Sequence, residues 1–146
     1  SEGIRYHKIL ESKNEIKSRV IELLDNVNLD ESYLERYPHQ LSGGQKQRLC
    51  IARAISLNPK LIICDEAVSA LDISTQNTII KLLNKLKKQL KLSYLFITHD
   101  LSVARLIADR ILVLKKGEIV ELSTAEKIFK SPKNRYTKKL ISALDF

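Results

Sequence analysis

Glycine is scarce in this sequence, which has only Gly3, Gly43, Gly44 and Gly117. A phosphate-binding P-loop follows the pattern Gly-x-x-x-x-Gly-Lys-Ser/Thr, and the dinucleotide-binding fingerprint follows Gly-x-Gly-x-x-Gly. No pair of these glycines fits either pattern in its sequence context. These residues therefore contain neither of the two common glycine-rich phosphate loops.

Long apolar runs are also lacking, since runs such as Leu61–Cys64 and Ile111–Leu114 have only four residues. A membrane helix needs about 20, so we expect no membrane-spanning segment. The start, Ser1-Glu2-Gly3, has no methionine and no signal-peptide pattern, which predicts a cut inside a longer chain. With 146 residues, 44% apolar and 29% charged, the chain has the size and composition of about one globular domain.

Cysteine is sparse as well. Cys50 and Cys64 are the two cysteines, and they form no Cys-x-x-Cys pair and have no histidine at metal-ligand spacing. We therefore expect a reduced, cytosolic compartment. We also expect both cysteines to be small buried apolar side chains.

The net charge of +8 is concentrated in two stretches. Lys81–Lys91 has five lysines and no acid, and Lys127–Lys139 has six basic residues and no acid, whereas the remainder is slightly acidic. Lysine-rich faces without interleaved aromatic residues are usually solvated surface, so we expect no nucleic-acid partner.

The apolar periodicity predicts an α/β protein. Expected helices span 13–26, 42–58, 72–90, 100–107, 124–130 and 135–144, with strands at 61–64 and 94–98 and a hairpin of 110–114 and 118–122. Capping boxes are expected at Ser12–Glu15 and Ser42–Gln45. Alternating strands and helices predict a parallel sheet with right-handed crossovers, in which strand 61–64 is buried on both faces.

Two polar pairs follow the expected parallel strands, where ligands bind in open sheets. Asp65-Glu66 ends one strand and His99-Asp100 ends the other, which predicts a common rim. An apolar strand that ends in Asp is typical of a Walker B segment, in which the carboxylate binds Mg²⁺ through water and the next Glu acts as general base. The alternative is that these acids only cap the following turns.

The Ser42-Gly43-Gly44-Gln45 segment opens a helix. Backbone N–H groups and the helix dipole at such an end favour a phosphate, and glycines allow close approach to the backbone. The alternative is an ordinary capped helix.

Four ordered segments together resemble the nucleotide-binding domains of ATP-binding cassette (ABC) transporters. They match the signature motif, Walker B, the D-loop and the H-loop, and they are Leu41–Arg48, Leu61–Glu66, Ser69–Asp72 and Ile97–Asp100. Tyr37–Gln40 and the tail Ser131–Leu140 are similar to the oligopeptide/dipeptide/nickel importer subfamily. The family's P-loop, adenine-stacking aromatic residue and Q-loop lie upstream, so the resemblance is to the C-terminal portion of the domain.

The resemblance implies a fold and a division of the chain. The fold is the C-terminal part of a P-loop NTPase domain, with short parallel strands and crossover helices. The implied segments are a helical subdomain ending in the signature helix (1–58), a RecA-like core portion (59–122) and a C-terminal helical tail (123–146). Loss of flanking strands would expose sheet edges, which predicts self-association.

The resemblance also implies a role for each matching residue. In the subunit's own site, Asp65 helps hold Mg²⁺, Glu66 positions the attacking water and His99 contacts the γ-phosphate. The residues that serve the ATP of the opposite subunit, or link the two sites, are Ser42, Gly43, Gly44, Gln45 and Asp72. The family usually has Pro-Thr after the Asp-Glu pair, whereas this chain has Ala67-Val68, which is expected to loosen Glu66.

The implied protein is an ATP-binding, ATP-hydrolysing subunit of an importer for oligopeptides, dipeptides or nickel, with the 146 residues alone inactive. It would be cytoplasmic and peripheral on the inner face of the cell membrane. Its partners would be a second ABC ATPase subunit, in a homo- or heterodimer, permease subunits and, indirectly, a solute-binding protein. The alternatives are a truncated regulatory module and a soluble ABC ATPase acting on nucleic acid.

Overall fold

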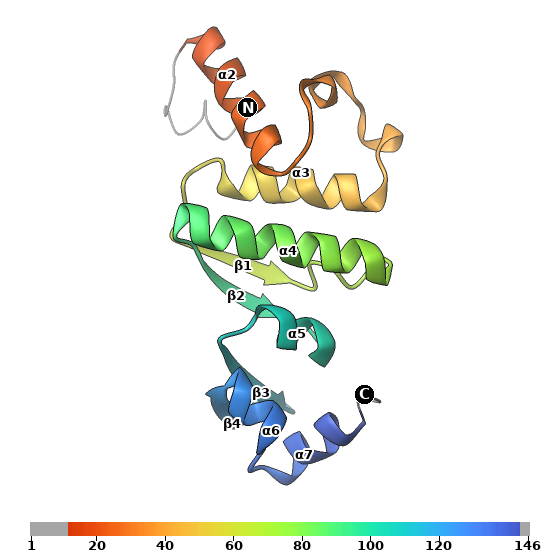
Figure 1. Cartoon of the computed structure of the whole chain (residues 1–146), viewed down its shortest axis with the longest axis vertical. Coiled ribbons are helices and arrows are strands. Elements are labelled where there is room, and N and C mark those ends of the chain that lie inside the picture. Colours follow the sequence, from red (N-terminus) through yellow and green to blue (C-terminus); the bar gives the residue numbers. More distant parts are fainter. Residues whose placement is uncertain (1–11, 144–146) are drawn as a thin grey trace. The chain divides into compact units, whose positions relative to one another are not determined.

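The computed structural model describes residues 12–143, and the chain divides into two compact units, residues 1–95 and 96–146. The first unit contains α2 (Lys13–Asn26), η1 (Glu31–Glu35), η2 (Pro38–Gln40), α3 (Gly43–Ile55), β1 (Leu61–Asp65) and α4 (Ile73–Leu90) (Figure 1). Strand β2 (Ser93–Ile97) crosses the boundary. The second unit contains α5 (Leu101–Ile107), β3 (Arg110–Lys115), β4 (Glu118–Thr124), α6 (Ala125–Lys130) and α7 (Arg135–Ser142).

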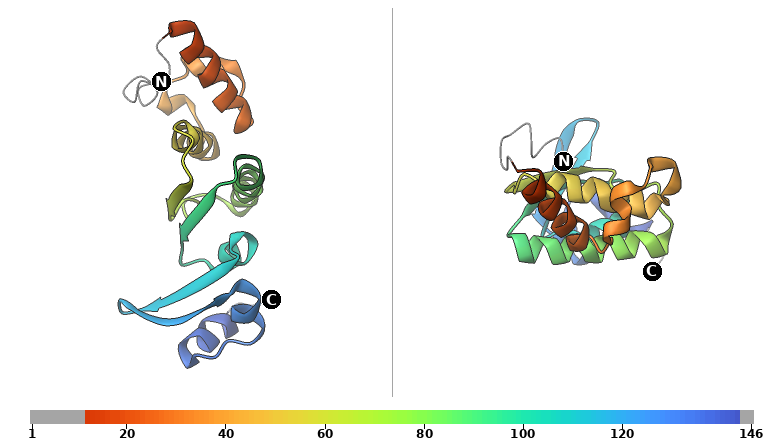
Figure 2. Two further views of the ribbon diagram at one scale, coloured as in Figure 1. Left: turned by 90° about the vertical axis from the view of Figure 1, so that its left-hand side faces the viewer. Right: turned by 90° about the horizontal axis from the view of Figure 1, so that it is seen from above.

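The core of the first unit lies among its three long helices. Helix α3 packs against both α2 and α4, and α3 and α4 run side by side (Figures 1 and 2). Each helix contributes one apolar face, as the periodicity predicts. The buried residues on these faces are Ile16, Leu23 and Leu24 of α2, Ile51, Ala52 and Ile55 of α3, and Ile79, Ile80, Leu82, Leu83 and Leu86 of α4.

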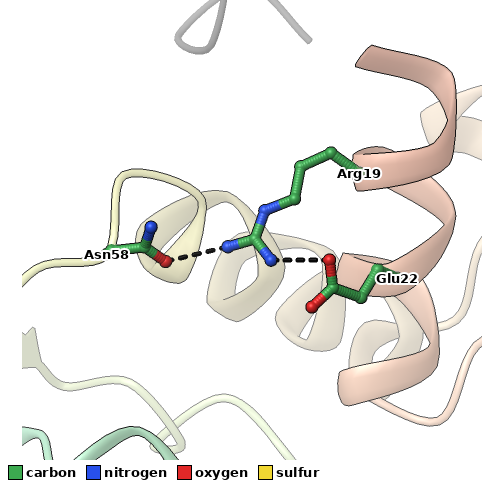
Figure 3. Close-up of polar contacts among 3 residues, drawn as sticks. All are labelled: Arg19, Glu22 and Asn58. Atoms are coloured by element: carbon green, nitrogen blue, oxygen red, sulfur yellow. Dashed lines mark hydrogen bonds and ion pairs between the residues drawn. The ribbon is translucent and has the colours of Figure 1, made fainter. Parts of the chain in front are cut away.

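A polar bridge joins α2 to the segment after α3 (Figure 3). The Arg19 guanidinium donates to Glu22 Oε2 at 2.7 Å and to Asn58 Oδ1 at 2.8 Å. Asn58 has a left-handed backbone, with φ of 50°, which asparagine adopts more readily than most residues. The bridge fixes the chain where α3 ends, and its exposed ion pair contributes only a fraction of a kcal/mol.

Strands β1 and β2 are neighbours in a two-stranded sheet within the described residues, and their arrows run in the same direction (Figure 1). Cys64 is buried, whereas Leu61 and Ile63 on the opposite face of β1 are 53% and 62% exposed. The prediction that this strand is buried on both faces is therefore wrong. A continuous apolar run does not show how many faces of a strand are covered.

The Tyr94 side chain of β2 connects this sheet to α4. Its hydroxyl donates to the Leu83 carbonyl of α4 at 3.1 Å. Burial raises the pKa of Tyr94 to about 12, and the neighbouring Cys64 thiolate adds to the rise. Burial also raises the pKa of the Cys64 thiol.

We therefore expect Tyr94 to ionise well above the ordinary tyrosine range. The folded state favours the neutral phenol, so its stabilising contribution is complete below about pH 10, the ordinary tyrosine pKa, and is lost as the pH rises towards 12. An absorbance titration of phenolate should show one step near pH 12 that Tyr94→Phe removes and Tyr37→Phe, at a 67% exposed position, retains. Absence of a step near pH 12 that depends on Tyr94 would contradict this.

The second unit is built on an antiparallel hairpin. Strand β3 pairs with β4 from Arg110 opposite Thr124 to Lys115 opposite Glu118, with a register shift between Val113 and Leu114. The two-residue loop, Lys116-Gly117, has φ values of 52° and 83°, as a type I′ turn requires.

The C-terminal tail is attached to this hairpin through Glu121 of β4. The Glu121 carboxylate accepts the backbone N–H groups of Lys133 at 2.9 Å and Asn134 at 3.0 Å. These bonds, the Lys133 bond foremost, hold the pKa of Glu121 below its ordinary value. Asn134 in turn donates to the Val120 carbonyl and accepts from Tyr136 N, which caps α7. The segment 131–142 is therefore held in place on the hairpin.

Most predicted elements are confirmed within a few residues, and so is the α/β class. Besides the burial of β1, two further predictions are wrong. The Ser12 side chain forms no capping hydrogen bond, so the first capping box is not made. Cys50 is exposed, because the inward face of α3 consists of residues 51, 52 and 55. The predicted boundaries 1–58, 59–122 and 123–146 stay a prediction.

None of the described helices combines the length and the apolar composition of a membrane span.

Candidate functional site

The turn that opens α3 has the predicted capping box. Ser42 Oγ accepts the backbone N–H of Gln45 at 3.3 Å, and Gln45 Oε1 accepts the backbone N–H of Ser42 at 2.9 Å. The next two donors are the N–H groups of Gly43 and Gly44, and the residues that the structure describes supply no acceptor to them. This end of α3 can therefore offer two backbone donors to an anion.

Gln45 is engaged within its own chain at both ends of its side chain. Besides the bond to Ser42, its Nε2 donates to the hydroxyl of Tyr33 in η1 at 2.8 Å. Gln45 thus shapes the turn, and its predicted place beside a phosphate stays a prediction.

The two glycines face the start of α4. A Cβ atom added at Gly43 would lie 3.3 Å from Leu71 Cδ2, and one added at Gly44 would lie 2.7 Å from Thr75 Cγ2. The second distance is too short for a real contact, so Gly44 has no room for a side chain. Side chains of the same chain therefore already approach the backbone of this turn closely.

Asp65 and Glu66 lie at the carboxyl end of β1, and both are exposed. Glu66 has a left-handed backbone with φ of 49°, which costs a residue other than glycine roughly 1–2 kcal/mol. Its carbonyl accepts from Ser69 N at 3.2 Å and from Ser69 Oγ at 3.0 Å. Ser69 therefore closes the turn in which the family usually has a proline.

No group of three or more His, Cys, Asp or Glu side chains forms a metal site within residues 12–143. Mg²⁺ in nucleotide sites is usually held by one or two carboxylates together with phosphate oxygens and water. A single exposed carboxylate at Asp65 is compatible with that kind of coordination, and not with a cage built of protein ligands alone.

Asp72 caps the N-terminus of α4. Its carboxylate accepts from Thr75 N at 2.9 Å, from Thr75 Oγ1 at 2.7 Å and from Ser74 Oγ at 2.8 Å. These bonds, the Thr75 hydroxyl foremost, hold the pKa of Asp72 well below its ordinary value. Asp72 is therefore the N-cap of α4, whereas its role across a dimer interface stays a prediction.

His99 and Asp100 follow β2 in the second unit. Asp100 accepts from Ser102 N and Val103 N and thereby caps α5, so capping explains this acid. His99 is exposed. The boundary between the units lies within β2, and the predicted common rim of His99 with Asp65 and Glu66 stays a prediction.

Sequence reasoning missed three residues that organise this region: Tyr33, Ser69 and Thr75. Thr75 had a usable signal, because Asp72-x-Ser-Thr at a helix start favours side-chain bonds from both hydroxyls to the cap. No comparable signal pointed to Tyr33, because its bond joins η1 to α3 across a loop.

Comparison with known proteins adds to this geometry. An ABC transporter family model matches residues 3–69. The oligopeptide transport ATP-binding protein OppF of Bacillus subtilis is 46% identical over 144 residues, which are 99% of this chain and 47% of the relative. The dipeptide transport ATP-binding protein DppF of Lactococcus lactis is 43% identical over 99% of this chain and 46% of the relative. The chain spans about half the length of these relatives.

Solved structures of ABC cassettes are also similar to this chain. The dimeric structure of MJ0796, described as a bacterial ABC transporter cassette, is 39% identical, with a TM-score of 0.67 over 80% of this chain and 50% of that chain. A second structure of that cassette, described as a post-hydrolysis state bound to ADP and Pi, matches with the same values.

Proposed function

This chain belongs to the ABC transporter family, and from that premise we propose that it is the signature-bearing part of an ATP-hydrolysing importer subunit. Relatives named for oligopeptide and dipeptide transport support a peptide as the transported solute. The tail Ser131–Leu140, held against β4 by Glu121, supports the same subfamily, which also includes nickel importers.

The observation that carries this proposal is the turn Ser42–Gln45, where two side-chain-free residues present backbone donors at a capped helix end. In the proposed complex, Ser42 Oγ and the N–H groups of Gly43 and Gly44 bind the γ-phosphate of ATP held by a second subunit. Preorganised donors of this kind stabilise the charge that develops during phosphoryl transfer.

The residues after the two strands would act on the subunit's own ATP. Asp65 would hold Mg²⁺ through water, and the bound ion would neutralise phosphate charge. Glu66 would orient the attacking water and accept its proton. His99 would contact the γ-phosphate, and Asp72 would link the two sites.

The proposed partners follow from the same arrangement. They are a second ABC subunit of the same or another kind, permease subunits in the membrane and, indirectly, a solute-binding protein. The protein would work on the cytoplasmic face of the cell membrane.

The test uses a chimera in which this chain replaces the matching segment of the Bacillus subtilis relative. These 146 residues contain no P-loop, so we expect no detectable ATP hydrolysis by the chain itself and Mg²⁺-dependent hydrolysis by the chimera. Ser42→Ala should lower the chimera's activity by about 10–100-fold, because it removes a bond to a charged phosphate. Ser56→Ala, at the other end of α3, is the matched control.

Mixing two chimeras tests the arrangement across subunits. Ser42→Ala and Glu66→Gln chimeras should each be weakly active, and mixing should restore hydrolysis because one composite site then has both residues intact. Absence of restoration would contradict the shared site. Substantial hydrolysis by the 146-residue chain alone would overturn the proposal.

A further inference from the structure

One side chain joins the turn at the start of α3 to the start of α4. Thr75 Cγ2 faces Gly44, at 2.7 Å from where a Cβ would stand, while Thr75 Oγ1 donates to Asp72 Oδ2 at 2.7 Å. All three residues lie in the first compact unit.

The two branches of Thr75 are not independent, since both are attached to the same β-carbon. The hydrogen bond to Asp72 fixes Oγ1 and therefore also fixes where the methyl group points. A second bond, from Thr75 N to Asp72 Oδ1 at 2.9 Å, holds the backbone of the same residue. The methyl group is thus held against Gly44 by the capping carboxylate.

The segment that precedes Asp72, residues 66–71, is also held by hydrogen bonds. Gln76 Nε2 donates to the carbonyl of Val68, which is 2% exposed, at 2.9 Å. The Ser69 bonds to the Glu66 carbonyl continue this path to the end of β1. These hydrogen bonds, the peptide bonds between neighbouring residues and the Thr75 methyl contact together link the turn of Glu66 to the turn of Gly44.

We propose that Thr75 is a positioning residue that sets the distance between the Gly44 turn and the Asp72 segment, so that the two move as one unit. The inference rests on the proposed function only for the identity of the ligand at the turn. The coupling itself belongs to the 146-residue chain and can be measured without nucleotide.

The test is a double-mutant cycle of Gly44→Ala and Thr75→Ser, read by chemical denaturation of the full chain. Thr75→Ser keeps both donors to Asp72 and removes the methyl group. Gly44→Ala in the original chain should lower the folding equilibrium constant about tenfold, because the new Cβ collides with a held methyl group. In the Thr75→Ser background the same change should raise it up to about fivefold, because alanine is the better helix former.

The coupling is shown if Gly44→Ala lowers the folding equilibrium constant in the original chain and raises it in the Thr75→Ser background. An equal effect of Gly44→Ala in both backgrounds would overturn the proposal. Gly43→Ala is the matched control: its neighbour is the flexible end of Leu71, so its effect should not depend on residue 75.

The role of Asp72 has its own spectroscopic test. Asp72→Asn can still accept the backbone N–H of Thr75, but its amide nitrogen cannot accept the hydroxyl. NMR couplings should show one χ1 rotamer of Thr75 in the original chain and averaging in Asp72→Asn, with a smaller penalty for Gly44→Ala. A single rotamer in both would overturn the assignment of Asp72 as the group that holds Thr75.

The rate of ATP hydrolysis by the chimera distinguishes a positioning role of Thr75 from a role in packing alone. Thr75→Val keeps the shape and removes the hydroxyl, and it should lower hydrolysis at least fivefold, whereas Thr78→Val on the same helix should not. Unchanged hydrolysis in Thr75→Val would overturn the positioning role. If the unmodified chimera itself failed to hydrolyse ATP, the proposed function would fail, and the cycle would still decide the coupling.

Discussion

Replacing Glu66 with Gln in the chimera is expected to lower ATP hydrolysis by about 10²–10⁴-fold, the usual contribution of a positioned general base. The amide keeps the size of the side chain but cannot accept a proton from water. ATP binding should change little, because Ser42 and the two glycines do not depend on that carboxylate. The measurement is steady-state phosphate release together with ATP affinity.

The backbone of Glu66 makes this experiment clean. With φ of 49°, residue 66 pays the same conformational cost as Glu or as Gln, so the substitution should not alter folding. Glu118→Gln, at an exposed glutamate of the hairpin, is the control and should retain full activity. Hydrolysis within threefold of the unmodified chimera would show that Glu66 is not the base.

Replacing Leu86 with Ala is expected to destabilise the first unit by about 2–5 kcal/mol, the usual cost of emptying a fully buried leucine site. Leu86 is 0% exposed and lies on the apolar face of α4 with Ile79 and Leu83. Domains are stable by only about 5–15 kcal/mol, so much of the margin would be lost. The chain has no tryptophan, so urea unfolding should be followed by circular dichroism.

Leu90→Ala on the same helix is the matched control, because Leu90 is 41% exposed and its truncation leaves little cavity. Its cost should stay below about 1 kcal/mol. Equal losses for the two variants would mean that α4 does not face the core as described.

Helices were the most predictable part of the fold. Helix α2 begins and ends where the periodicity predicts, at Lys13 and Asn26, and Asp72, Asp100 and Thr124 cap the helices that follow them. Caps and apolar faces are local features, so a single sequence contains enough information to find them.

The features that could not be predicted depend on neighbours distant in sequence. The run Leu61–Cys64 indicates a strand but not which faces are covered. Likewise, Gly44 and Thr75 meet only because α3 and α4 pack together, so the sequence predicts that something approaches the glycine but not what does. The common rim expected for Asp65 and His99 stays a prediction, because the two residues lie in different compact units.

The exposed face of β1 has a practical consequence for the laboratory. Leu61 and Ile63 are largely exposed to solvent, and Leu95 of the neighbouring strand β2 is 52% exposed. Solvatochromic dyes that report melting by binding such surfaces would fluoresce before any heating, and the baseline would hide the transition. Label-free detection would therefore suit every measurement of thermal stability.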